Sequence, residues 1–221
     1  WAFVIGSYGV ASYAYFTTND PQYSLKLSFS RGLSRLAGTI STIEIPESLR
    51  SPLYGMYSRI YNVNTEEMVD DITSYKNFQE FFTRKIKPRP VDPNPLSLTS
   101  PADSVVLCYS EVNSDAALIV KGIEYKMGEF ITGIEGYRLN GEIISTMKRN
   151  SENKLYQIVL YLAPGDYHRF HSPCDFQIKT RNHITGLLKP VKVNHVKTRK
   201  GIYEKNERVR DRKSTRLNSS H

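Results

Sequence analysis

A proline-rich segment, Lys87-Pro-Arg-Pro-Val-Asp-Pro-Asn-Pro95, separates two stretches of sequence with different hydrophobic patterns. Its alternating prolines lack the backbone donor that a helix or a central strand requires, and they favour extended structure. Residues 19–86 before it carry helical patterns, whereas residues 96–209 after it carry short β-rich runs separated by turns. The sequence therefore predicts an α+β protein, with a helical region at 19–86, a linker at 87–95 and a mainly antiparallel β domain at 96–209.

The expected elements follow from the spacing of apolar and capping residues. Helices are predicted over residues 25–36 and from residue 46 to residue 60, where Pro46 can occupy the first turn. Two pairs have the spacing of caps that begin short helices, namely Asn64 with Glu67 and Asn77 with Glu80. Strands are predicted at residues 105–109, 116–120, 155–162 and 176–180.

The N-terminal stretch differs from the rest of the chain because it carries no charge as far as Asn19. Residues 1–18 are mainly apolar, small or aromatic, and their number is close to the lower limit for crossing a bilayer, about 17 residues. The stretch lacks an initiating methionine, so it is interpreted as a transmembrane segment cut at its start, with membrane-proximal helices after it. A buried helix and the remnant of a signal peptide are the alternatives.

The side chains most suggestive of chemistry follow the predicted strand at 155–162. Ala163-Pro-Gly-Asp166 ends that strand as a turn, and Tyr167, His168 and His171 come directly after it. Histidine can take or give a proton near neutral pH. Upstream, Asp103 stands directly before an apolar run and could supply a carboxylate that orients a histidine. A histidine beside an aspartate can equally be a structural pair in a loop.

Four motifs together give this chain a family resemblance. They are Ser100-Pro-Ala-Asp103, Lys121-Gly-Ile-Glu-Tyr125, the run Tyr161-Leu-Ala-Pro-Gly-Asp-Tyr-His-Arg-Phe-His-Ser-Pro173, and Asn206-Glu-Arg-Val209. In this order and at this spacing, over about residues 45 to 209, they resemble phosphatidylserine decarboxylase of the mitochondrial type.

The resemblance implies an enzyme that makes its own cofactor. In that family, a serine in a Leu-Gly-Ser-Thr-like motif near the C-terminus attacks the preceding peptide carbonyl, and the resulting ester eliminates to leave a pyruvoyl group. The pyruvoyl group forms a Schiff base with phosphatidylserine, and loss of CO2 gives phosphatidylethanolamine. By motif position, Asp103 would orient His171 as the base for self-cleavage, and His168 would assist protonation beside the pyruvoyl carbonyl. Tyr167 is a candidate for substrate binding.

Partners and location are likewise implied by the resemblance. The substrate is phosphatidylserine in a membrane, and the partner chains are the protein's own second subunit after self-cleavage and a second copy in a homodimer. The expected location is the mitochondrial inner membrane, with the catalytic part facing the intermembrane space. Part of the formal net charge of +8 lies in residues 210–221, so the remainder is mildly basic and no nucleic-acid partner is expected.

The sequence departs from the family pattern at its end and beside Asp103. Its one Gly-Ser pair is Gly6-Ser7, so the pyruvoyl-forming serine is missing. Residues 211–221 resemble a translated sequencing adapter, and residues 210–221 are predicted to be a non-native tail, which leaves the β domain incomplete and this chain inactive by itself. Ser104 stands where the family usually has glycine. It would displace Asp103 if that position needs a positive φ, and would not in a tolerant turn.

Two other classes of function fit parts of the pattern. A metal hydrolase could use Asp166, His168 and His171, with His183 or His195, because imidazoles and carboxylates bind zinc. No His-Glu-x-x-His helix accompanies them, and no metal is assigned. A non-catalytic lipid-binding relative would fit the missing serine if the ending were genuine. Cys108 and Cys174 are expected to be thiols rather than a disulfide.

Overall fold

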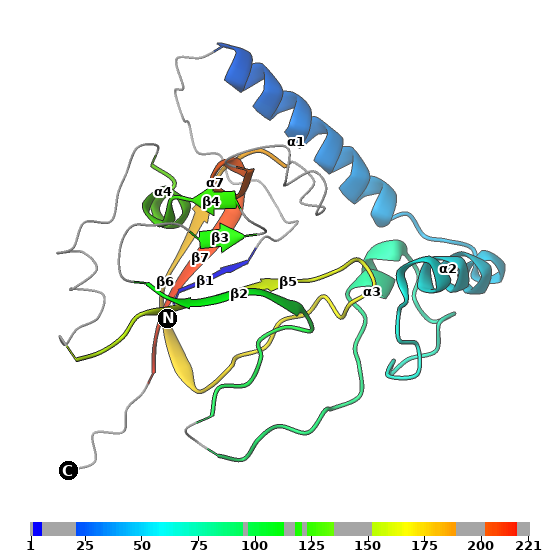
Figure 1. The fold of residues 1–221 in the computed structure, drawn as a ribbon. Coiled ribbons are helices and arrows are strands. Elements are labelled where there is room, and N and C mark those ends of the chain that lie inside the picture. The colour runs from blue at the N-terminus through cyan, green and yellow to red at the C-terminus, as the bar shows by residue number, and fades with distance from the viewer. Residues whose placement is uncertain are drawn as a thin grey trace. The chain divides into compact units, whose positions relative to one another are not determined.

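The computed structural model describes residues 2–5, 21–94, 97–112, 118–120, 123–134, 152–188 and 202–215. Its helices are α1 (Pro21–Ser41), α2 (Glu47–Tyr61), α3 (Phe78–Phe82), α4 (Met127–Thr132) and α7 (Ile202–Lys205) (Figure 1). Its strands are β1 (Ala2–Ile5), β2 (Val105–Glu111), β3 (Leu118–Val120), β4 (Ile123–Tyr125), β5 (Tyr156–Tyr161), β6 (Phe176–Ile184) and β7 (Arg208–Thr215). This mixture of helices and short sheets confirms the α+β class.

The strands form small sheets. One has the order β1-β7-β6, and two further sheets pair β2 with β5 and β3 with β4. The pairs β1–β7 and β3–β4 are antiparallel. The chain divides into two compact units. We call residues 36–105, 160–177 and 215–221 the helical unit, and residues 1–35, 106–159 and 178–214 the β unit.

The core of the helical unit is built around aromatic rings from α2 and α3. Tyr54 and Phe81 are almost completely buried, and their rings stack with centroids 4.4 Å apart. The hydroxyl of Tyr54 donates to the carbonyl of Tyr75 at 3.1 Å, which satisfies its polar end. The remaining buried members of this cluster are Val63, Met68 and Tyr75. Burying these rings fixes α2 against α3 and sets the frame for the segments around them.

The ends of the two helices are encoded locally. Helix α2 follows Pro46, as predicted, and ends where Asn62 takes a left-handed conformation with φ of 57°. At the start of α3, the Asn77 side chain accepts from the Glu80 amide at 2.9 Å, which confirms that cap. The predicted cap at Asn64 is wrong. Its side chain accepts from the amide of Glu66 at 3.1 Å and closes a turn, because an asparagine can bond two residues ahead without any helix following.

The β unit has its own buried cluster, formed by Val112, Tyr125, Met127 and Ile202. The strands predicted at 105–109, 155–162 and 176–180 are confirmed as β2, β5 and β6, although β6 runs on to Ile184. Of the strand predicted at 116–120, the structure describes residues 118–120 as β3. Strand β7 extends from Arg208 through the first residues of the segment predicted to be a non-native tail. Both cysteines are free thiols, as predicted.

The transmembrane prediction for residues 1–18 falls mostly outside the described residues. Within that stretch, Ala2–Ile5 are extended and pair with residues 209–212 of β7, so they do not begin a helix. None of the helices in the described ranges is long and apolar enough to cross a membrane. Helix α1 instead exposes apolar side chains at helical spacing, namely Phe29, Leu33, Leu36 and Ile40.

Candidate active site

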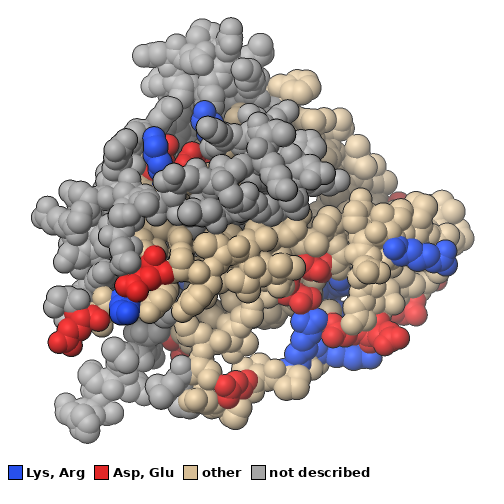
Figure 2. All heavy atoms as spheres, viewed as in Figure 1, with Lys and Arg blue, Asp and Glu red and all other residues tan. Residues whose placement is uncertain are grey.

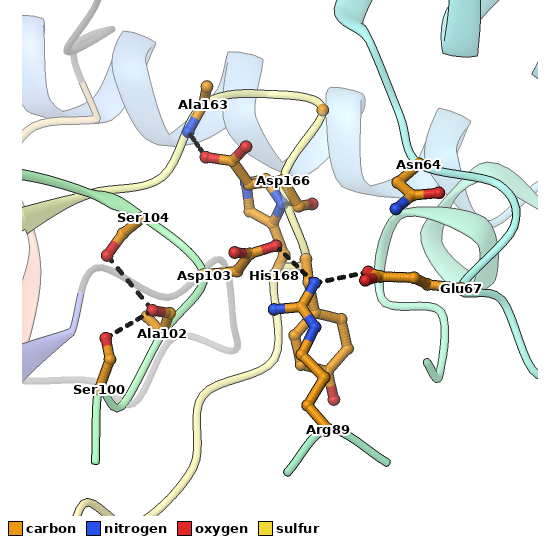
Figure 3. A network of polar contacts seen from close by, with 12 residues as sticks. Asn64, Glu67, Arg89, Ser100, Ala102, Asp103, Ser104, Ala163, Asp166 and His168 are labelled. Atoms are coloured by element: carbon orange, nitrogen blue, oxygen red, sulfur yellow. Dashed lines mark hydrogen bonds and ion pairs between the residues drawn. The ribbon is translucent and has the colours of Figure 1, made fainter. Parts of the chain in front are cut away.

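The turn at residues 163–166 is closed by its own aspartate. The amide of Asp166 donates to the carbonyl of Ala163 at 3.0 Å. In return, the Ala163 amide donates to Asp166 Oδ2 at 2.6 Å (Figure 3). This reciprocal pair explains why the strand stops here and gives the turn a fixed conformation. We refer to residues 163–166 as the 163–166 turn.

Neighbouring residues of the helical unit hold this turn by its main chain. The Tyr57 hydroxyl donates to the carbonyl of Pro164 at 2.8 Å. Nη2 of Arg84 donates to the next two carbonyls, those of Gly165 at 2.8 Å and Asp166 at 3.3 Å. A side chain at Gly165 would place its Cβ 1.9 Å from the carbonyl oxygen of Tyr61, so only glycine allows this approach.

His168 is oriented by the same turn. Its Nδ1 lies 2.8 Å from the carbonyl oxygen of Asp166. A carbonyl oxygen can only accept, so Nδ1 carries the proton and Nε2 keeps a lone pair in the neutral ring. The ring packs on Phe82, with centroids 4.0 Å apart. Burial lowers the pKa of His168 and outweighs the bond to Asp166, and the charge of Arg84 acts in the same direction as burial. His168 is therefore a neutral base at neutral pH.

His171 occupies a different setting. Its Nε2 lies 2.9 Å from the hydroxyl of Tyr167, and the two rings stack with centroids 5.6 Å apart. The amide of His171 donates to the carbonyl of Pro101 at 2.8 Å, and the amide of Thr99 donates to the carbonyl of Pro173 at 3.0 Å. These bonds place the histidine-bearing segment beside the Ser100-Pro-Ala-Asp103 motif, although the two are far apart in sequence.

The carboxylate of Asp103 pairs with an arginine rather than with a histidine. Oδ2 of Asp103 lies 3.3 Å from Nη2 of Arg89, and the same nitrogen pairs with Glu67 (Figure 3). The Asp103 side chain is 37% exposed. Among the described residues, the structure thus brings the segments of Asp103 and His171 together but does not form a hydrogen bond between their side chains.

Comparison with known proteins identifies the family. The family model described as phosphatidylserine decarboxylase matches residues 78–214, more than half of the chain. The rat mitochondrial phosphatidylserine decarboxylase proenzyme is 35% identical over 197 residues, which cover 81% of this chain and 47% of the relative. The chain belongs to the phosphatidylserine decarboxylase family.

Similarity to this family extends across distant organisms. The phosphatidylserine decarboxylase proenzyme of Plasmodium falciparum is 36% identical, over 83% of this chain and 49% of the relative. The mitochondrial proenzyme 1 of Arabidopsis thaliana is 32% identical, over 81% of this chain and 46% of the relative. The chain therefore spans about half the length of the curated phosphatidylserine decarboxylases that it matches.

The departure from the family's usual glycine at Ser104 does not strain the backbone. Asn62 is the one non-glycine residue with positive φ in the described part of the chain. The Ser104 hydroxyl donates to the carbonyl of Ala102 at 3.3 Å, and the Ser100 hydroxyl donates to the same carbonyl at 2.8 Å. Position 104 is thus in a tolerant turn, and a serine there does not require Asp103 to move.

Among the described residues, the side chains named as ligands for a metal hydrolase do not converge. Nδ1 of His168 faces a carbonyl, and the Asp166 carboxylate accepts from Ala163. His183 belongs to the β unit, where it pairs with Glu207 at 2.8 Å, and His195 lies outside the described residues. Within the described ranges, no three histidine, cysteine or acidic side chains gather closely enough to hold a metal ion.

Sequence patterns missed Tyr57, Arg84 and Arg89 as parts of this site. Each acts through a residue distant in sequence, Pro164, Gly165 and Asp103 respectively. A local pattern reports the periodicity of one element and says nothing about such distant contacts. The one available signal was the arginine two residues after the phenylalanine-rich stretch at 78–82, because a cation next to a buried helix must either reach solvent or find acceptors.

Proposed function

We propose that the protein containing this chain is a phosphatidylserine decarboxylase, which converts phosphatidylserine to phosphatidylethanolamine and CO2 by means of a pyruvoyl group made from one of its own serines. Membership of the family supports the reaction class. The observation that carries the proposal is the state of His168, a neutral imidazole whose proton is fixed on Nδ1 and whose Nε2 is left for proton transfer.

We propose that the residues around His168 serve a pyruvoyl cofactor. When present, such a group supplies the electron sink for loss of CO2, and the protein must add orientation and proton transfer. Nε2 of His168 holds or moves the proton, while Phe82 covers one face of the imidazole ring and limits access of water. Tyr57 and Arg84 hold the turn that carries His168. Tyr167 directly precedes His168 in the chain, and we propose it as a substrate-binding residue.

For self-processing, we propose that Asp103 orients His171 and that His171 removes the proton of the serine that becomes the pyruvoyl group. Two backbone bonds between residues 99–101 and 171–173 support this pairing, because they already hold the two segments adjacent. The Asp103 carboxylate is partly exposed and bound to Arg89 by one hydrogen bond, so it can exchange partners without leaving a buried ion. Self-cleavage would produce two subunits, in keeping with the name proenzyme that the relatives carry.

A membrane-borne substrate agrees with the surface of the helical unit. Helix α2 exposes apolar side chains at helical spacing, namely Leu49, Leu53, Met56 and Ile60, while its other face packs in the aromatic core. On the face drawn in Figure 2, acidic and basic side chains gather together at the lower right, next to a broad uncharged surface. Contiguous exposed apolar groups of this kind favour contact with lipid or protein. We propose that they face the bilayer that holds phosphatidylserine.

We also propose a mitochondrial location, on the inner membrane with the catalytic part in the intermembrane space, and possible assembly as a homodimer. Support for the organelle comes from relatives in rat and Arabidopsis thaliana that are named mitochondrial. Imaging of the tagged full-length protein, followed by protease protection of isolated mitochondria, tests the location. Protection of the catalytic part in intact mitochondria and its digestion after rupture of the outer membrane is the expected result.

The decisive experiment separates the two histidines in the full-length protein. We expect His171→Ala to leave one uncleaved chain on a denaturing gel. His168→Ala should still cleave, but should release CO2 from phosphatidylserine vesicles at least about 100-fold more slowly. His183→Ala, which alters a histidine of the β unit, is the matched control and should behave as wild type. Full decarboxylation by His168→Ala would disprove its role, and vesicle binding without CO2 release by wild type would favour a non-catalytic relative.

The printed chain provides a second control. Residues 1–221 contain no Gly-Ser-Thr or Gly-Ser-Ser sequence from which the cofactor could form. We therefore expect this polypeptide, expressed without further sequence, to release no CO2 from phosphatidylserine. Measurable CO2 release by it would contradict the proposal that the reaction depends on a pyruvoyl group.

A further inference from the structure

Arg84 is a buried cation whose surroundings do not neutralise it. It lies two residues after α3 and is only 2% exposed. Its guanidinium sits over the ring of Phe81, 5.8 Å from the centroid, and Nη2 donates to the carbonyls of Gly165 and Asp166. Nε and Nη1 are also buried and have no hydrogen-bond partner in the part of the chain that the structure describes. Among the described residues, no carboxylate forms an ion pair with Arg84, although Asp103 and Asp166 lie near enough to act on its charge.

Burying such a residue lowers the stability of the folded protein. Removing a guanidinium from water costs several kcal/mol, and unpaired buried donors add to that cost. Replacement of buried charges by apolar side chains of similar volume is often neutral or stabilising. A contribution to stability therefore does not explain why position 84 is an arginine. Its role must come from the carbonyl groups to which Nη2 donates.

The contact that links Arg84 to the chemistry is a shared acceptor. The carbonyl oxygen of Asp166 accepts from Nη2 of Arg84 at 3.3 Å and from Nδ1 of His168 at 2.8 Å. A carbonyl oxygen has two lone pairs, so both bonds can form at once. Holding this oxygen in place keeps a proton acceptor in front of Nδ1, and that selects the tautomer of the neutral ring.

The charge of Arg84 acts in the same sense as its geometry. The charged groups that face His168 are Arg84, from the segment after α3, and the carboxylate of Asp166, from the turn. Phe82, from α3, contributes an apolar face. Arg84 disfavours a second proton on the ring, whereas the Asp166 carboxylate favours it and is partly committed to the amide of Ala163.

We propose that Arg84 is a positioning residue for His168, which fixes the carbonyl of Asp166 so that His168 presents an unprotonated Nε2 to the reacting group. Arg84 touches neither substrate nor cofactor in this role and acts through His168. The catalytic consequence rests on the proposed function, whereas the choice of tautomer does not.

The test combines a spectroscopic and a kinetic measurement on the full-length protein. Nitrogen NMR of histidine-labelled protein should show His168 protonated at Nδ1 and unprotonated at Nε2 at neutral pH. In Arg84→Met the preference for this tautomer should be lost, and the midpoint of His168 titration should rise. The kcat for CO2 release should fall by about 10-fold, while KM for phosphatidylserine vesicles stays within about 2-fold. Arg84→Lys keeps the cation and should recover part of kcat.

Arg169→Met is the matched control. Arg169 adjoins His168 in sequence and donates from Nε to a backbone carbonyl, that of Thr83, at 2.6 Å, but it does not bond the 163–166 turn. It should leave the tautomer and kcat unchanged.

The outcomes separate this proposal from the proposed function. An Nε2-protonated His168 in wild type, or an unchanged tautomer and titration midpoint in folded Arg84→Met, would overturn the positioning role. If Arg84→Met does not fold, the test rests on two other measurements. The expected tautomer in wild type, together with a reduced kcat at unchanged KM in Arg84→Lys, would support the positioning role. The expected tautomer in a wild-type protein that releases no CO2 would support the positioning role and sink only the decarboxylase assignment.

Discussion

Among the described residues, each of the two units holds one buried arginine stacked on a phenylalanine, and the two arginines differ in how completely they are bonded. In the β unit, Arg208 is 4% exposed and sits over Phe130 at 5.5 Å. It donates to four carbonyls, those of Phe130, Glu129, Glu204 and Asn206. In the helical unit, Arg84 uses one nitrogen for two carbonyls, and Nε and Nη1 have no partner among the described residues.

The difference separates a structural arginine from a functional one. Arg208 connects α4 to α7 and to Asn206 directly after it, and the hydrogen bonds of its three nitrogens offset part of the free-energy cost of its burial. The hydrogen bonds of Arg84 offset less of its burial cost, but Arg84 donates to the carbonyl that also accepts from His168. A buried cation that is poorly satisfied yet bonded to a histidine-bearing turn is the pattern expected where stability is given up for control of protonation.

The largest expected effect tests this contrast directly. Arg208→Met should destabilise the full-length protein by about 3 kcal/mol or more, because it leaves several buried carbonyls without donors. Arg84→Met should cost about 1 kcal/mol or less, because the lost bonds are offset by relief of a buried charge. Urea unfolding followed by circular dichroism measures both. Equal losses in the free energy of unfolding for the two variants would contradict the proposed difference between Arg208 and Arg84.

A somewhat smaller effect is expected from Gly165→Ala. The added methyl group would meet the carbonyl oxygen of Tyr61 at 1.9 Å, so the 163–166 turn must shift away from Tyr61. We expect a loss of about 2 kcal/mol together with reduced decarboxylation. Gly55→Ala is the control, since its methyl group meets nothing within 4 Å and it lies in helix α2. That variant should be stabilised by up to about 1 kcal/mol. Unchanged stability of Gly165→Ala would show that the turn is not held as described.

Tyr57→Phe tests how much the Tyr57 hydroxyl, the second group that holds the 163–166 turn, contributes to stability. It removes the hydroxyl that donates to the carbonyl of Pro164 at 2.8 Å and should cost about 1 kcal/mol. Burial raises the pKa of Tyr57 to about 12, so in wild type the unfolded chain loses this proton before the folded protein does. Stability should therefore decline as pH rises above about 10, and Tyr57→Phe should decline less. An identical alkaline decline in both proteins would contradict this reading.

The smallest expected effect is on acid stability. The pKa of His168 is lowered in the folded protein, first by burial. Below about pH 6.5 the unfolded chain binds the extra proton more readily, so stability contributed by neutral His168 is lost as pH falls through its folded pKa. His168→Gln should flatten this part of the stability curve, measured as urea midpoints between about pH 7 and pH 5. A steeper acid decline in His168→Gln would indicate that His168 is stabilised as a cation.

How much of this could be foreseen depends on whether the controlling contact is local. Helix α2 after Pro46, the Asn77–Glu80 cap and the strands around 105, 155 and 176 rest on periodicity and caps within a few residues, and all are confirmed. Helix α4 and strand β7 were not predicted. Strand β7 carries alternating basic residues, and its Asp211 is buried against Arg181, a contact 30 residues away. No local pattern contains that information.

The candidate site divides in the same way. The motifs around Asp103 and His171 were recognised from their order along the chain, and the structure places their backbones side by side. The partners of the side chains were not foreseen: Asp103 with Arg89, His171 with Tyr167, and His168 with a carbonyl. Hydrogen-bond choice among neighbouring polar groups depends on distances of a few tenths of an ångström, which residue types alone do not specify.

The hydrogen bonds that hold the 163–166 turn also determine which substitutions the turn tolerates. Tyr57 and Arg84 bond carbonyl oxygens, a group that every amino acid carries, and not the side chains of the turn. A library that randomises Pro164 should therefore recover many working variants. The same library at Gly165 should recover almost none, because any Cβ there collides with Tyr61. In this part of the molecule, permissiveness to mutation is set by the path of the backbone, and it changes completely from one position to the next.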